Sequence, residues 1–78
     1  MNFPELERIT FNPNVMGGKP CIRGMRVTVG TITGLLASGE SMETILKVYP
    51  YLEQADIYAA LGYATWRTEE YDVLLKAS

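Results

Sequence analysis

The chain contains a single cysteine, Cys21, and no histidine among its 78 residues. An internal disulfide therefore cannot form, and the usual ligands of a structural zinc site are missing. A chain of this length buries only about 60% of its unfolded surface, so a core without such cross-links has little stability to spare. Hydrophobic residues make up 47% of the chain, which is enough for one core. We expect a single domain over residues 1–78, with no metal and no cofactor.

The spacing of apolar residues changes near Val29. Before it, "RITFNPNV" and "CIRGMRVTV" alternate as extended chain does, which predicts a short β-arm or β-ribbon over residues 1–28. After it, the period rises to about 3.6 residues, which predicts three helices over residues 29–66 and a helical tail over 67–78. The expected fold is mainly α, with a helix-turn-helix outline behind an N-terminal β-arm.

Each predicted helix has an apolar stripe. Ser41 is expected to cap the second helix, Gly39 to end the first in a left-handed conformation, and Pro50 to stop the second. In the third helix, which we expect to begin near Glu53, two opposite faces are apolar. We assign one face of the third helix to the core and the other to a partner. The stripe of the first helix is Val29, Ile32, Leu35 and Leu36, and that of the second is Met42, Ile45, Leu46 and Tyr49. In the third helix, the core face is Ile57, Ala60, Leu61 and Ala64, and the partner face is Ala59, Gly62, Tyr63 and Trp66.

The segment "GGKPCIRGMRVTV" carries three cations, Lys19, Arg23 and Arg26, within eight positions. A phosphate-binding loop needs backbone N–H donors leading into a helix, and Pro20 removes one of them. The glycines more simply indicate a turn. The three cations on a β-arm predict contacts with a nucleic-acid backbone.

Charge is divided unequally along the chain. Residues 1–30 hold four cations and two carboxylates, whereas residues 31–78 hold three cations and seven carboxylates. Glu53 and Asp56 lie at the amino end of the third helix, where their negative charges interact favourably with the helix dipole. DNA would repel them, unless one accepts a hydrogen bond from a cytosine amino group. No histidine, activated cysteine or paired carboxylates form a catalytic pattern, so we do not expect an enzyme.

Three segments together resemble a known family: "GGKPCIRGMRVTV", "ITGLLASGESMETILKVYPYL" and "DIYAALGYA" are similar to domain-of-unknown-function family 433. The resemblance implies a homeodomain-like core and the role of a VapB-type antitoxin, which binds a PIN-like ribonuclease toxin and operator DNA. Under this hypothesis Tyr63, Trp66, Arg67, Tyr71 and Leu74 bind the toxin, with Arg67 reaching its acidic metal site.

Two alternatives stay open. In the first, the protein is a homodimeric interaction module that binds no DNA, and Tyr63 and Trp66 are its anchors. In the second, those two rings only cover the β-arm. No leader or membrane-spanning pattern is visible in the sequence, so we expect a cytoplasmic protein that does not enter the membrane.

Overall fold

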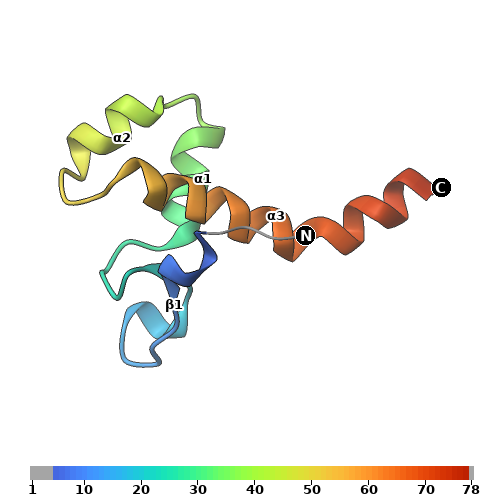
Figure 1. Cartoon of the computed structure of the whole chain (residues 1–78), viewed down its shortest axis with the longest axis horizontal. Coiled ribbons are helices and arrows are strands. Elements are labelled where there is room, and N and C mark those ends of the chain that lie inside the picture. The colour runs from blue at the N-terminus through green and yellow to red at the C-terminus, as the bar shows by residue number, and fades with distance from the viewer. Residues whose placement is uncertain (1–4, 78) are drawn as a thin grey trace.

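Residues 5–77 form three α-helices and one small antiparallel sheet, which confirms the mainly α fold with an N-terminal β-arm. Figure 1 shows the computed structural model, which describes the backbone of residues 5–77 and the side chains of residues 5–68. In chain order the elements are two 3-10 turns alternating with two short strands, followed by the three helices: η1 (Leu6–Arg8), β1 (Ile9–Thr10), η2 (Met16–Gly18), β2 (Cys21–Ile22), α1 (Val29–Ala37), α2 (Met42–Val48) and α3 (Gln54–Ala77).

The two strands pair in antiparallel register, with Ile9 opposite Ile22 and Thr10 opposite Cys21. After β2 the chain reverses direction, because the Met25 N–H donates to the Ile22 carbonyl at 2.8 Å. The two central residues of this turn, Arg23 and Gly24, have φ angles of 45° and 74°. Positive φ at both positions is typical of a type I′ turn. Gly24 adopts it without strain, whereas Arg23 does so against its intrinsic preference.

The helix boundaries follow local chemistry. The Thr28 hydroxyl accepts the Thr31 N–H at 3.1 Å, and the Ser41 hydroxyl accepts the Thr44 N–H at the same distance, so α1 and α2 both begin with a side-chain cap. Gly39 has a φ of 99° just after α1, which confirms the predicted left-handed C-terminal residue. The expected cap at Ser41 is confirmed as well.

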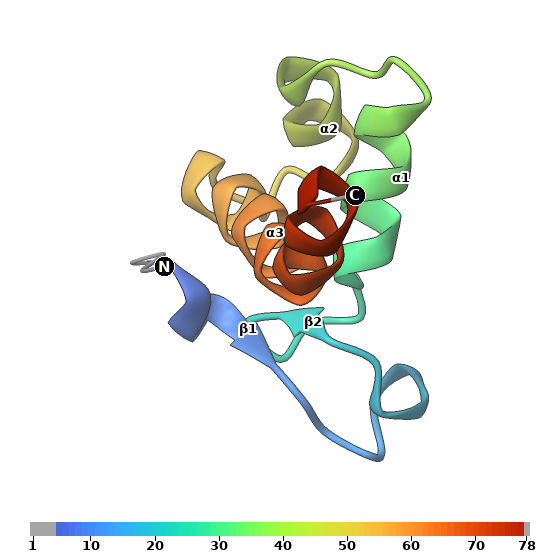
Figure 2. The ribbon, with the colours of Figure 1, turned by 90° about the vertical axis from the view of Figure 1, so that its right-hand side faces the viewer.

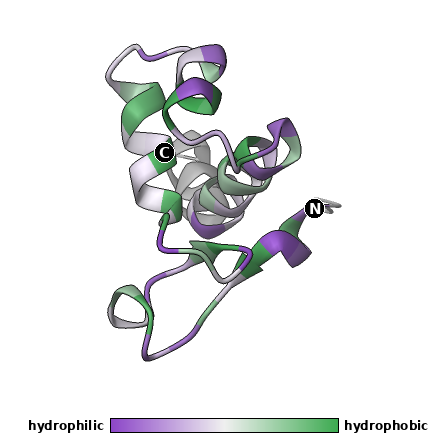
Figure 3. Cartoon of the chain, turned by 90° about the vertical axis from the view of Figure 1, so that its left-hand side faces the viewer, coloured by the Kyte–Doolittle hydropathy of each residue, from purple (hydrophilic) through white to green (hydrophobic). Residues whose placement is uncertain are grey.

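The core lies where α1, α2 and the sheet meet one side of α3. Figure 2 looks almost along α3, with α2 above it, α1 beside it and the two strands beneath. Each of these elements contributes one fully buried isoleucine: Ile22 from β2, Ile32 from α1, Ile45 from α2 and Ile57 from α3. Figure 3 colours the ribbon by hydropathy and shows hydrophobic segments in the helices and strands that supply these buried residues. The apolar stripes predicted for α1 and α2 are confirmed by this packing.

The assignment of faces on α3 was partly wrong. Ala59 and Gly62, predicted for the partner side, are buried, and Tyr63 packs against the core. Leu61, predicted for the core, is 38% exposed, and Ala64 is half-buried. The periodicity could not choose the face, because α3 carries apolar residues all round and alanine fits either environment. The β-arm also covers part of α3, since η1 and β1 contact it and the Phe11 ring meets Tyr63.

Candidate functional site

The carboxylate of Asp56 is the most heavily bonded side chain at the junction of the β-arm and the helices. It is fully buried, in the first turn of α3. Arg23 contacts it twice, with Nε donating to Oδ1 at 3.0 Å and Nη2 donating to Oδ2 at 2.8 Å. Arg8 donates from Nη1 to Oδ1 at 3.0 Å, and the Glu53 N–H donates to Oδ2 at 2.8 Å. Asp56 thus caps its own helix and binds two arginines from the arm.

The two arginines extend the network to the surface. Arg8 also donates from Nη1 to the Glu53 carboxylate and from Nε to the Glu5 carboxylate, each at 2.7 Å. Arg23 donates from Nη2 to the Tyr51 carbonyl at 3.1 Å, which ties it to the α2–α3 turn. The hydrogen bonds that Arg23 donates to Asp56 and Tyr51 hold its side chain and so help to maintain its strained backbone. We call the residues Glu5, Arg8, Arg23, Glu53 and Asp56 the arm–helix ion network.

Protonation in this network is shifted in consistent directions. Burial alone would raise the pKa of Asp56, but the hydrogen bonds from Arg23, the Glu53 N–H and Arg8 outweigh it, so the pKa of Asp56 lies below its ordinary value. The hydrogen bond to Glu53, followed by those to Asp56 and Glu5, raises the pKa of Arg8. The hydrogen bond to Asp56 raises the pKa of Arg23. All three groups are therefore held in their charged forms.

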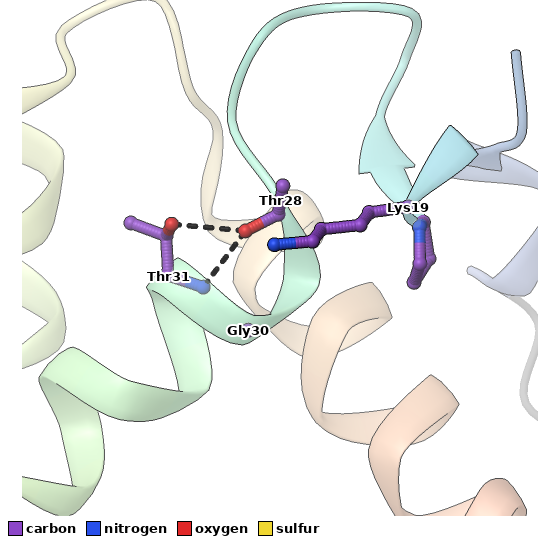
Figure 4. A pocket seen from close by; sticks show the side chains of 5 residues that line it. Lys19, Thr28, Gly30 and Thr31 are labelled. Carbon is purple, nitrogen blue, oxygen red and sulfur yellow. Dashed lines mark hydrogen bonds between the residues drawn. The ribbon is translucent and has the colours of Figure 1, made fainter. Parts of the chain in front are cut away.

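The three cations predicted to bind nucleic acid lie in different environments. Arg23 is bound to Asp56, so its charge is neutralised within the molecule. Lys19 and Arg26 are both exposed. Figure 4 shows the Lys19 side chain extending toward the start of α1, over a hollow that Pro20, Thr28, Gly30 and Thr31 also line.

The glycine segment forms a turn, as the simpler interpretation proposed. Gly17 and Gly18 lie in the 3-10 turn η2, with φ angles of 67° and 83°. The chain then enters β2 instead of a helix. A phosphate loop places its backbone donors at the start of a helix that follows directly, so this segment has a different geometry.

The aromatic residues predicted to bind a partner meet the β-arm. Tyr63 is half-buried, and its ring centroid lies 5.9 Å from that of Phe11 and 6.0 Å from that of Trp66. Phe11 and Trp66 are 60% and 49% exposed. Tyr63 therefore does cover the arm, whereas Trp66 retains a large accessible surface. Arg67 is exposed, and the predicted contacts Tyr71 and Leu74 lie outside the residues whose side chains are described.

Sequence reasoning missed Arg8 and Phe11. Phe11 comes directly after β1, which ends at Thr10, and its ring is exposed. For Asp56, the spacing of three residues from Glu53 was the available signal, because a carboxylate at that position reaches back to the N–H before the helix.

Within the described part of the chain, no cluster of histidine, cysteine and carboxylate residues could hold a metal ion. Among its helices, none has the length and apolarity needed to cross a membrane.

Comparison with known proteins identifies relatives over most of the chain. A family model described as a protein of unknown function, DUF433, matches residues 9–64. An uncharacterized protein of Sinorhizobium fredii, y4eO, is 38% identical over 58 residues, which are 74% of this chain and 26% of that protein. The chain thus spans about a quarter of the length of this relative. A crystal structure of a DUF433 member protein from Anabaena variabilis superposes with a TM-score of 0.75 at 30% identity, covering 88% of this chain and 68% of that one.

The Asp56 carboxylate should dominate the stability of the arm–helix junction. We expect Asp56→Asn to lower the free energy of unfolding by about 3 kcal/mol, because it leaves two arginines without their shared buried anion. Urea unfolding followed by circular dichroism measures this difference. Glu40→Gln, at an exposed loop position, is the matched control and should change the unfolding free energy by less than about 0.5 kcal/mol. Equal effects of the two variants would contradict a structural role for the network.

The low pKa of Asp56 also predicts the direction of a pH effect. A carboxylate whose pKa is lower in the folded state stabilises the protein above its unfolded pKa, about 3.9 for aspartate, and this contribution is lost as pH falls through the folded pKa. We expect the unfolding free energy of the wild type to fall more steeply below about pH 4 than that of Asp56→Asn. Urea titrations from pH 2 to pH 6 test this, and parallel curves for the two proteins would refute it.

Proposed function

This chain belongs to the DUF433 family of proteins of unknown function, and we propose that it works by binding another protein through α3. In the specific form of this proposal, the protein is the antitoxin of a toxin–antitoxin pair, and its partner is a PIN-like ribonuclease. The family resemblance suggests that role. The shape of α3 is the observation that carries the proposal.

Helix α3 is much longer than the core that supports it. It has 24 residues, about 36 Å of helix at 1.5 Å per residue, and Figure 1 shows its C-terminal half projecting away from α1, α2 and the sheet. A helix without tertiary packing is marginal in water, because its stability comes mainly from an apolar face held against another element. A projecting helix of this kind is suited to pack on a second protein.

Trp66 lies where α3 leaves the core, and it supplies an anchor for such a partner. The centroid of its ring lies 6.0 Å from that of Tyr63, whose ring in turn contacts Phe11 of the arm, so the indole packs on one side against this aromatic pair. Large aromatic side chains that are already ordered lose little entropy on binding and often dominate interface energies. Arg67 is next to it and exposed, and its guanidinium is suited to pair with carboxylates of a nuclease metal site. Tyr71 and Leu74 would extend the contact along the same helix.

A second function, binding of operator DNA by a homeodomain-like helix-turn-helix, is favored by one observation. Residues 9–39 contain no aspartate or glutamate, and Lys19 and Arg26 are exposed within them. Two features limit this function. Arg23 is neutralised by Asp56, and α3 carries no lysine or arginine from Gln54 to Trp66, where a recognition helix would meet DNA. A module that binds partners but not DNA is the corresponding alternative.

The partner proposal predicts a large effect at Trp66. We expect Trp66→Ala to weaken binding to a PIN-like nuclease encoded beside this protein by about 30-fold, the usual cost of losing an aromatic hot spot. Isothermal titration calorimetry and inhibition of nuclease activity both measure it. Val48→Ala removes another exposed apolar side chain, on α2, and should leave affinity unchanged. No binding by the wild type, or equal affinity of the two variants, would contradict the proposal.

The DNA proposal makes a separate prediction about salt. If Lys19 and Arg26 contact phosphates, the double variant Lys19→Ala with Arg26→Ala should lower affinity for operator DNA and reduce the slope of log K against log salt concentration by about 2. Fluorescence anisotropy with duplex from the protein's own promoter measures both quantities. An unchanged slope, or no binding by the wild type, would favor the module that does not bind DNA.

A further inference from the structure

A stripe of five exposed residues runs along α3 on the side away from the core. Its members are separated by four, three, four and three positions, and each is exposed: Gln54, Tyr58, Leu61, Thr65 and Thr68. This alternation repeats every seven residues, which is the spacing that keeps one seam of a helix facing a neighbouring helix. We call these five residues the α3 seam.

The α3 seam carries no charge and presents mainly apolar surface. Tyr58 and Leu61 are 53% and 38% exposed. The Thr65 hydroxyl donates to the Leu61 carbonyl at 2.9 Å, and the Thr68 hydroxyl donates to the Ala64 carbonyl at 3.0 Å. Because both hydroxyls are bonded to the backbone of their own helix, both threonines can present their methyl groups outward without an unsatisfied polar group.

Small residues border the α3 seam on both sides. Ala55 lies along one border and Ala64 along the other, about 100° and 80° around the helix from the middle of the stripe, and both are half-buried. Without bulky side chains at these positions, a second helix can approach the backbone of α3 closely, so that its own side chains fit between those of the seam. The seam therefore has the spacing, the surface chemistry and the borders of a helix-packing face.

We propose that the α3 seam is the contact between two copies of this chain, with α3 packed on α3 across a twofold axis. In a twofold interface the same patch of both copies meets. A charged residue in the patch would therefore lie close to the same residue, or to its neighbours in the patch, on the other copy. Five consecutive seam positions without a charge remove that repulsion. Asp56, Arg67, Glu69 and Glu70 of the same helix lie off this line, and the first charge on it is Asp72, four residues after Thr68.

This contact is separate from the partner surface of the proposed function and does not depend on it. Trp66 lies about 120° around the helix from the middle of the α3 seam. Dimerisation through the seam would therefore leave Trp66 accessible on each copy. The dimer would present two docking helices, one from each chain.

Analytical ultracentrifugation of the full chain over a range of concentrations tests the proposal. We expect the wild type to sediment at twice the chain mass, and Leu61→Glu to raise the dimer dissociation constant by about 100-fold or more, because it places two carboxylates in one interface. Thr65→Glu is a second variant at an exposed seam position. Thr44→Glu, on α2, adds the same charge away from the seam and completes a capping box with Ser41, so it is the matched control.

Circular dichroism of each variant confirms that the helices remain folded. A wild type that stays monomeric up to several hundred micromolar would overturn the proposal, and so would a dimer that survives both seam variants. Single cysteine substitutions at Tyr58, Leu61 and Thr65 locate the twofold axis by showing which position forms a disulfide between two copies. Cys21 is buried and does not compete in disulfide formation. We expect at least one of the three to form an intermolecular disulfide under mild oxidation and Thr44→Cys to form none; the reverse pattern would place the contact elsewhere.

Discussion

The carboxylate of Asp56 joins the two halves of the molecule. The β-arm has strands of only two residues each, and such a short ribbon is not stable alone in water. Ile9, Ile22 and Val27 bury the apolar side of the arm against the helices, while Arg8 and Arg23 fix its orientation through Asp56. Apolar packing has little direction, whereas paired guanidinium–carboxylate bonds set both distance and angle. The ion network therefore determines how the arm sits on α3.

The network also changes which parts of the surface can serve a partner. A basic arm beside a helix-turn-helix outline suggests nucleic-acid binding, but the structure uses two of the four arginines and lysines of the first thirty residues to neutralise the Asp56 carboxylate of α3. The amino end of α3 is thereby fastened to the arm. The features left for recognition are the projecting half of α3, with Trp66 at its base, and the uncharged seam on its outer side.

Local features were predicted from the sequence more accurately than contacts between distant residues. The change of period at Val29, the cap at Ser41 and the glycine at position 39 each act within one turn of chain, and all three appear as expected. The bond between Arg23 and Asp56 joins residues 33 positions apart, and no spacing rule connects them. The faces of α3 were misjudged for a similar reason, because the β-arm that contacts α3 comes from far away in the sequence. Trp66 was singled out because the third helix has two apolar faces and only one of them can meet a single core; its side chain is 49% exposed in the structure.

The positive φ of Arg23 has a consequence for folding. The helices are built from contacts within a few residues, whereas the arm reaches Asp56 through bonds that span 33 and 48 positions. Contacts between distant residues form late, since a long loop must close before they contribute. Until they form, nothing outside the turn holds Arg23 in its unfavorable backbone conformation. The arm is therefore the segment that docks last, and brief openings of the native protein would begin there and leave the helical core intact.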